Sequence, residues 1–154
     1  MNTSKLVAIR SLEILSTGDR GHFDAVIHPA AHREGTREAP AARLPGPHGF
    51  YSAALFLRAA VYELRHDIVH AIADDGVVCL ETVMTGRRVG AFTLYTPTGE
   101  IERLIPADGT RFQVAQTHWM RVADNMVIRH WGFQGCLAGI EHSSRLSPAV
   151  GGAQ

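Results

Sequence analysis

The spacing of apolar residues predicts helices in the first part of the chain. One apolar set recurs at helical spacing before a possible stop at Gly18: Leu6, Ile9, Leu12, Ile14 and Leu15. Residues 21–27 fit a second short helix that Pro29 would end. Residues 49–63 show a strong amphipathic pattern. We therefore expect three helices in the first 63 residues.

The segment between the second and third predicted helices has a different character. Residues 28–48 are rich in histidine and proline: His28, His32, His48, Pro29, Pro40, Pro45 and Pro47. Prolines at such density disfavour both helix and central strand. We expect an irregular segment that crosses the mouth of a pocket.

After Arg65 the pattern changes to that of β-strands. Asp74-Asp75-Gly76 is a turn signal between two runs with strand character. The predicted strands are 67–73, 77–85, 90–95, 101–105, 111–122 and 126–134. Helices followed by antiparallel strands indicate an α+β fold, with the N-terminal helices packed on a curved, mostly antiparallel sheet. A sheet that wraps around one helix would form a cone-shaped α+β barrel, whose open end suits a small molecule.

Composition narrows the class of protein. The chain has 154 residues, and 45% hydrophobic with 19% charged residues is ordinary for a globular protein. We expect a single domain over 1–154, with an ordered core over about 1–142 and a tail at 143–154. Lys+Arg and Asp+Glu both number 15, so no excess charge would attract nucleic acid or an anionic membrane.

Location can also be predicted from the sequence. Lys5, Arg10 and Glu13 interrupt the first apolar stretch, which argues against a signal peptide. No uncharged run is long enough to span a bilayer. We expect a soluble cytoplasmic protein.

Nine histidines raise the question of a metal. His28 and His32 are four residues apart, but Pro29 makes a helix there doubtful. The chain has no His-Glu-x-x-His pattern and no paired cysteines. Glycine-rich nucleotide motifs are also absent. We predict neither a bound metal nor a cofactor.

Polar residues interrupt the strand pattern of the last predicted hairpin, and the turn decides how they meet. If Asp124-Asn125 alone forms the turn, His118 lies opposite Trp131. If Ala123 joins the turn, His118 lies opposite His130. We favour this second register. It would place one set of side chains on a single face: Gln116, His118, Met120, His130 and Gln134.

Several segments of the chain resemble a known family. Gln116-Thr117-His118-Trp119, the turn at 121–124 and His130-Trp131 resemble the SnoaL-like polyketide cyclases, which belong to the nuclear-transport-factor-2-like superfamily. Further matching segments are His28-Pro29, Arg33-Glu34, Gly49-Phe50-Tyr51, Leu64-Arg65 and Met84-Thr85-Gly86. The resemblance implies a cone-shaped barrel, a homodimer or homotetramer, and a hydrophobic ligand. It also implies a cofactor-free intramolecular aldol closure of a polyketide ring.

The resemblance assigns roles to particular residues. Gln116 and His118 match the family's glutamine and histidine. The family's acid/base aspartate follows its His-Trp pair, where this chain has Gly132. The family's asparagine before Arg-Glu corresponds to His32. Both departures affect the chemistry, so the resemblance implies the fold more firmly than the cyclase activity.

We therefore predict a cofactor-independent cyclase or isomerase, of the lyase or isomerase class, acting on an enolisable polyketide-like or polycyclic substrate. His118 would be the acid/base, Gln116 a hydrogen-bond donor and His32 a partner from the loop. The residues expected to contact the substrate are Gln134, His130, Tyr51, Leu55, Met120, Glu81 and Trp131. Alternatives are a ligand-binding protein without catalysis, and hydroxylation or other ring chemistry.

Some of these residues have a simpler interpretation. Trp119 and Trp131 suit packing, on the opposite face of the sheet or at a subunit contact, better than contact with a ligand. The direction of Glu81 is left open by alternation alone. His66 and His70 are interpreted as surface or edge residues.

Overall fold

The computed structural model describes residues 2–34 and 38–132. Its helical elements are α1 (Thr3–Thr17), α2 (Arg20–Val26), the short 3₁₀ helix η1 (Pro40–Arg43) and α3 (Gly46–Ala60). All three predicted α-helices are therefore present. The expected tail at 143–154 and the last part of the expected core, 133–142, lie outside the described residues.

Local signals set the ends of the first two helices. The Asn2 side-chain oxygen accepts hydrogen bonds from the backbone N–H groups of Ser4 and Lys5, at 2.8 and 3.3 Å. The backbone N–H of Gly18 donates to the carbonyl of Ile14 and closes α1. Asp19 then caps α2 in a reciprocal box with His22. The predicted stop at Gly18 is confirmed.

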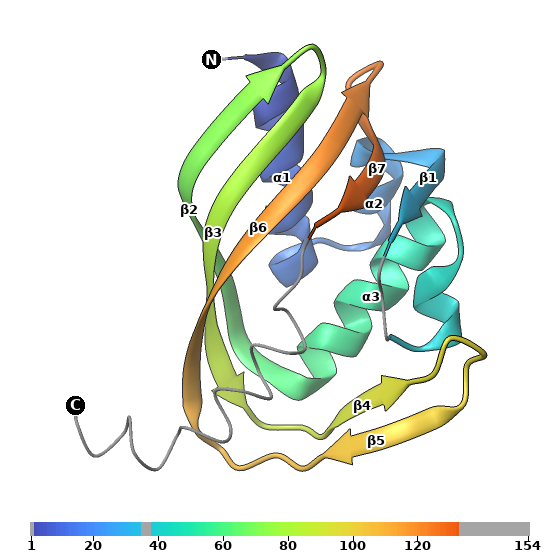
Figure 1. The fold of residues 1–154 in the computed structure, drawn as a ribbon, viewed down its shortest axis with the longest axis vertical. Helices are drawn as coiled ribbons and strands as arrows, with labels where there is room; N and C mark the ends of the chain where they lie inside the picture. Colours follow the sequence, from blue (N-terminus) through green and yellow to red (C-terminus); the bar gives the residue numbers. More distant parts are fainter. Residues whose placement is uncertain (1, 35–37, 133–154) are drawn as a thin grey trace.

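The strands form one large sheet and one small one. Their bounds are β1 (Ile27–Arg33), β2 (Val61–Asp74), β3 (Val77–Arg88), β4 (Phe92–Tyr95), β5 (Ile101–Ile105), β6 (Arg111–Ala123) and β7 (Met126–Trp131). The large sheet has the order β1-β7-β6-β3-β2, and β4 pairs with β5. Only the β1–β7 pair in the large sheet is parallel. The predicted α+β fold is confirmed, although the curved sheet does not close into a full barrel (Figure 1).

The first strand corrects a prediction. Residues 27–33 form β1, where the sequence suggested only irregular structure from residue 28 onward. β1 pairs with β7 alone in the large sheet, so it is an edge strand. Its register shifts between Ile27 and His32. An edge position with an irregular register tolerates Pro29, which cannot donate a ladder hydrogen bond.

The turn between β6 and β7 also corrects a prediction. Asp124 and Asn125 form a two-residue turn with φ of 53° and 58°, so Ala123 pairs with Met126. The predicted three-residue loop is wrong. The register then shifts, because Val122 pairs with Val127 and Arg121 pairs with Arg129. Ile128 is therefore an extra residue, which forms a bulge in β7.

The shift changes which side chains share a face. Met120 lies opposite His130, and Trp119 lies opposite Trp131. The predicted face that contains His118, Met120 and His130 therefore exists, but a bulge creates it and the turn does not.

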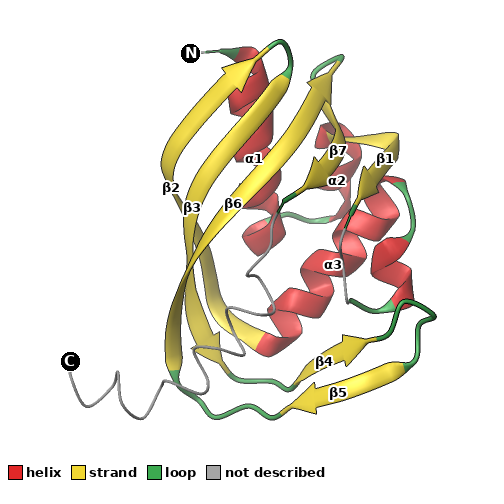
Figure 2. Ribbon diagram, viewed as in Figure 1, coloured by secondary structure: helices red, strands yellow, loops and turns green. Residues whose placement is uncertain are grey.

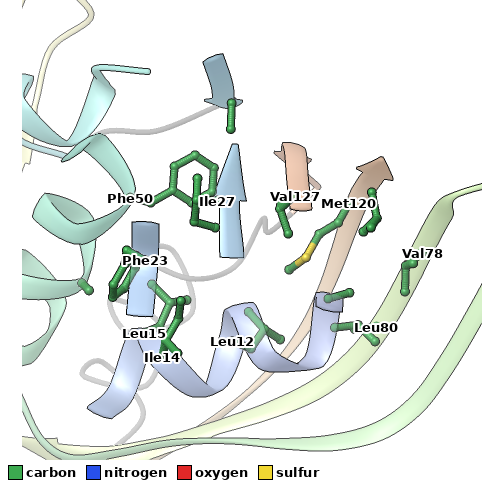
Figure 3. Close-up of a cluster of buried hydrophobic side chains, with 14 residues drawn as sticks. Leu12, Ile14, Leu15, Phe23, Ile27, Phe50, Val78, Leu80, Met120 and Val127 are labelled. Atoms are coloured by element: carbon green, nitrogen blue, oxygen red, sulfur yellow. The ribbon is translucent and has the colours of Figure 1, made fainter. Parts of the chain in front are cut away.

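The helices cover the concave face of the large sheet (Figures 1 and 2). Between them lies a buried apolar cluster that includes Leu12 from α1, Phe50 from α3 and Leu80 from β3. Figure 3 shows these side chains converging from the helices and the strands. A second cluster joins the end of α3 to the β4–β5 hairpin through Leu57 and Phe92. Two apolar clusters therefore hold the sheet in its curved form.

No helix in the described ranges combines the length and the apolar character that are needed to cross a membrane.

Arg58 links α3 to the C-terminal end of α1. Its guanidinium donates to the carbonyl oxygens of Leu15, Ile14 and Gly18 at 2.7, 2.5 and 2.8 Å. These carbonyls belong to the last turn of α1 and its C-cap Gly18, where backbone donors run out. That of Ile14 also accepts from Gly18 N–H, so Arg58 adds a charged donor to it. A cation at this end also interacts favourably with the helix dipole.

We expect Arg58→Met to lower the free energy of unfolding by about 1–3 kcal/mol, because it leaves these carbonyls without their charged donor. Urea unfolding of the wild type and the variant measures the change. Arg10→Met is the matched control, since Arg10 makes only an exposed pair with Glu13. Equal losses in both variants would contradict the assigned role of Arg58.

Candidate active site

Alternation along β6 sends a row of polar side chains to the concave face. Every second residue of β6 is buried, which includes Gln116, His118 and Met120. Gln116 and His118 are each 3% exposed, and so is His130 of the neighbouring strand β7. Buried polar groups of this kind must find hydrogen-bond partners within the protein.

The three polar residues bond to each other in a chain. His118 Nε2 lies 2.9 Å from Gln116 Oε1, and His118 Nδ1 lies 2.9 Å from His130 Nε2. An amide oxygen can only accept, so His118 Nε2–H donates to Gln116. His118 Nδ1 therefore accepts from His130 Nε2–H. The Gln116 amide also points its nitrogen at Met84 Sδ, 3.7 Å away.

Burial keeps these imidazoles uncharged at neutral pH. Desolvation, with smaller contributions from His66 and Arg33, lowers the pKa of His118 to about 3. The pKa of His130 is also well below its usual value, mainly through desolvation and then through His118. The pair thus presents neutral imidazoles, each with one N–H and one lone pair.

A third histidine joins the group from β2. The ring of His66 lies edge-on to that of His118, with centroids 5.9 Å apart. Burial lowers its pKa to about 4. The interpretation of His66 as a surface or edge residue is correct for its strand, since β2 lies at an edge of the large sheet, but it missed that the side chain is half-buried against His118. His70 is exposed as expected.

A bulge explains why His66 and His70 face opposite ways. Ile68 pairs with Thr82 and His70 pairs with Glu81, so Val69 is an extra residue in β2. The extra residue reverses the alternation between His66 and His70. Without the bulge, the even spacing of these two histidines would place both on one face.

Two buried polar atoms near these rings have no hydrogen-bond partner among the described residues. They are Nδ1 of His66 and Oγ1 of Thr82, whose side chain is fully buried. Thr82 lies opposite Gln116 in the β3–β6 ladder. A buried polar group without a partner costs roughly 1–3 kcal/mol, so such atoms are rare in purely structural positions.

A buried ion pair lies beside the histidines. Arg33 of β1 donates through both terminal nitrogens to the carboxylate of Glu38, and both side chains are buried. Arg33 pairs with His130 in the β1–β7 register, and its guanidinium lies 5.7 Å from the centre of the Phe50 ring. The sequence offered Arg33-Glu34 only as a family segment, and nothing in the spacing marked Glu38 as buried.

Three predicted site residues lie away from the histidine group. His32 is exposed on β1, so it is not the loop partner of His118. Glu81 points outward from β3, with its carboxylate 2.6 Å from His70 Nδ1. Leu55 is 46% exposed on α3. The strand that was read as a loop and the outward alternation of β3 explain the first two errors.

The remaining predicted contacts divide between core and outer face. Tyr51 packs against Phe23, and Met120 is fully buried in the same cluster. Trp131 stacks on Trp119 on the opposite side of the sheet, as the packing interpretation expected. Gln134 lies outside the described residues.

The position of the family's aspartate has a special geometry here. Gly132 has φ of +71°, a conformation that side chains rarely adopt. A Cβ built at this position would lie 2.6 Å from Cδ1 of Trp119. Replacing Gly132 by aspartate would therefore strain the backbone and press on the outer tryptophan pair.

In the described ranges no three His, Cys, Asp or Glu side chains are grouped so that they could hold a metal ion. The residues that come together instead form a neutral hydrogen-bonded chain with a buried ion pair at its side.

A comparison with known protein families identifies the family of this chain. The family model for SnoaL-like polyketide cyclases matches residues 5–138. The chain belongs to this family. A search of curated proteins found no match.

Solved structures share the SnoaL-like fold. TsrD of Streptomyces laurentii is 22% identical, covers 84% of this chain and 85% of its own, and has a TM-score of 0.65. A SnoaL-like polyketide cyclase of Agrobacterium tumefaciens is 14% identical, with coverages of 85% and 90% and a TM-score of 0.65. IdmH of Streptomyces antibioticus, a candidate polyketide cyclase, is 20% identical, with coverages of 84% and 90% and a TM-score of 0.62. At these identities the likeness shows the fold.

The neutral histidines of this SnoaL-like protein should make its stability depend on pH. Their pKa values are about 3 for His118 and about 4 for His66, below the ordinary 6.5. The unfolded chain therefore binds more protons below pH 6.5, so stability is full above that pH and falls as the pH drops. We expect a loss of roughly 1 kcal/mol per histidine for each pH unit.

Urea unfolding between about pH 7.5 and 5 measures this dependence. His118→Gln should weaken the dependence, because it removes one of the buried imidazoles. An identical pH dependence in the wild type and His118→Gln would refute the role of burial at His118.

Proposed function

We propose that this protein is a cofactor-independent cyclase or isomerase that acts on an apolar, enolisable substrate of polyketide type. The observation that carries this proposal is the buried His130–His118–Gln116 chain on the concave face of a SnoaL-like fold. His118 is the proposed acid/base, and Gln116 is its hydrogen-bonding partner. His66 takes the place that the sequence suggested for His32, because it lies beside His118.

The hydrogen-bonded row His130–His118–Gln116 supports acid/base catalysis because the donor and acceptor roles along it can reverse. At rest His118 Nε2–H donates to Gln116, and Nδ1 accepts from His130. In the opposite tautomers His118 Nδ1–H donates to His130, and Nε2 carries a lone pair. If a substrate displaces the Gln116 oxygen, Nε2 can then remove a proton from carbon.

An aldol closure needs only one such group. The Nε2 lone pair takes the proton from the carbon beside a carbonyl, and the resulting enolate carbon attacks a second carbonyl within the same molecule. His118 then returns that proton to the new alkoxide. No proton is gained or lost overall, so a single imidazole completes the cycle. Isomerisation follows the same route, with the proton returned to a different carbon.

The low pKa of His118 is compatible with this role. Desolvation lowers the pKa because an isolated imidazolium is unfavourable in an apolar surrounding. An enolate formed next to His118 supplies the opposite charge, which stabilises the imidazolium. The free-base form, which the reaction needs, is also the form that is present at neutral pH.

The family resemblance extends the proposal to assembly, and the charged N-terminal sequence extends it to location. We expect a homodimer or homotetramer in the cytoplasm that binds a hydrophobic small molecule. The absence of a carboxylate at Gly132 favours the second candidate, a ligand-binding protein of the same fold without catalysis. Hydroxylation or other ring chemistry is a further alternative that the sequence left open.

A carbon-acid exchange assay separates catalysis from binding. We expect the protein to accelerate the exchange of the acidic hydrogens of 2-tetralone, an apolar bicyclic ketone, in deuterium oxide. His118→Gln should slow the exchange at least about tenfold, since a positioned acid/base group contributes roughly 10²–10⁴-fold. Proton NMR follows the loss of signal with time.

His70→Gln is the control, since His70 is exposed and bonded to Glu81. Its exchange rate should equal that of the wild type. Wild-type exchange no faster than that of His118→Gln would refute catalysis by His118. Binding of 2-tetralone without exchange would favour the ligand-binding candidate.

The pH profile of the exchange gives an independent check. Because the pKa of His118 is about 3, its free-base form predominates above that pH. After subtraction of the buffer rate, the protein-catalysed rate should stay flat from about pH 8 down to about pH 5.5. Circular dichroism at each pH verifies that the fold persists. An acid limb with its midpoint at the ordinary histidine value would show that the catalytic base is an exposed imidazole.

A further inference from the structure

We propose that His66 and Thr82 form a subsite for a hydroxyl group on a flat, uncharged ligand such as a phenol or an enol. This inference deepens the proposed function, because it names a chemical class for the molecule that the concave face binds. It begins from the two polar atoms that are buried without a partner among the described residues, His66 Nδ1 and Thr82 Oγ1.

The strand register brings these atoms to one place. β3 lies between β2 and β6 in the sheet, as Figure 1 shows. Thr82 pairs with Ile68 on one side and with Gln116 on the other. His66 is the inward residue two positions before Ile68 in β2, so it lies diagonally opposite Thr82, where cross-strand neighbours are roughly 7–8 Å apart or slightly less.

His118 approaches Thr82 from the opposite strand. It lies one inward position beyond Gln116 on β6, and its ring meets that of His66 edge-on with centroids 5.9 Å apart. Thr82 is thus the inward residue of β3 that lies between the two imidazoles. A ligand group bound at Thr82 would lie next to the proposed acid/base.

A hydroxyl group matches the hydrogen-bonding needs of both atoms. The Thr82 hydroxyl can donate to the oxygen of the ligand, and His66 Nδ1 can accept the hydrogen of that ligand. One bound hydroxyl therefore satisfies two groups that otherwise remain buried without partners. An ether or a hydrocarbon at the same point leaves at least one of them unsatisfied.

The charges nearby favour a neutral ligand. Burial keeps the pKa of His66 and His118 well below neutrality, so neither ring carries a positive charge to attract an anion. The buried Arg33 guanidinium is bonded to the Glu38 carboxylate on both terminal nitrogens. A carboxylate or phosphate would therefore be desolvated here without a new counter-charge.

His66 also offers a route to the subsite. Its side chain is partly exposed, unlike those of Thr82, Gln116 and His118. Met84, which lies opposite His66, is an unbranched side chain that can change rotamer. Rotation of the His66 ring is therefore the route that we propose for a ligand to reach Thr82.

Equilibrium titration with two matched probes tests the subsite. The probes are 2-naphthol, an aromatic analogue of the enol of 2-tetralone, and 2-methoxynaphthalene, in which the hydroxyl hydrogen is replaced by methyl. We expect the wild type to bind 2-naphthol about tenfold more tightly. Thr82→Val and His66→Phe should each remove most of this preference, with 2-methoxynaphthalene affinity unchanged within about twofold.

Matched variants guard against loss of the fold. Thr82→Ser retains the hydroxyl and should retain the preference, whereas His70→Phe alters an exposed histidine and should bind as the wild type does. Thr82→Val should melt no lower than the wild type, since it removes an unpartnered buried hydroxyl. Equal affinity of the wild type for both probes, or failure to bind either, overturns the proposal. So does a preference that survives in Thr82→Val.

The outcome is distinguishable from that of the exchange assay. A 2-naphthol preference without 2-tetralone exchange leaves the subsite standing and removes the catalytic function. Exchange of 2-tetralone without a 2-naphthol preference supports the catalytic function and removes the subsite.

Discussion

The structure depends on how polar imidazoles are accommodated on the apolar, concave face of a curved sheet. An imidazole buried without partners is unfavourable, and a buried imidazolium is more so. Here His118 gains hydrogen-bond partners in Gln116 and His130, and the imidazoles of His118 and His130 both stay uncharged. Phe50 of α3, one of the helices on this face (Figure 2), stacks on His130 with ring centroids 6.4 Å apart, and the three side chains are almost fully shielded from water. The same burial that lowers the pKa values thus supplies a dry surrounding in which hydrogen bonds are strong.

Much of the fold could be predicted from the sequence because its signals are local. The helix stop at Gly18, the turn at Asp75-Gly76 and the alternation along β6 each act within a few residues. The candidate site was harder to predict, because a single inserted residue decides which face of the sheet the following side chains occupy. Val69 and Ile128 are such residues, and neither carries a distinctive sequence signal. Hence His118, Gln116 and His130 were placed together correctly, whereas His66 was missed.

Membership of the SnoaL-like family explains the fold and leaves the chemistry to the particular residues present. The chain retains a glutamine and a histidine on the concave face but has Gly132 after His130-Trp131. The left-handed backbone at Gly132 and its contact with Trp119 show that the segment is adapted to glycine. The acid/base proposal therefore relies on imidazoles that neighbouring strands bring together.

The bulge at Ile128 has a consequence for comparing this chain with its relatives. Val127 and His130 both face inward although three positions separate them, which simple alternation forbids. An alignment that counts without gaps from the Asp124-Asn125 turn would match His130 to an outward residue in any relative with an unbulged strand. Equivalent positions in this family should therefore be assigned by ladder partners, with Met120 as the reference for His130.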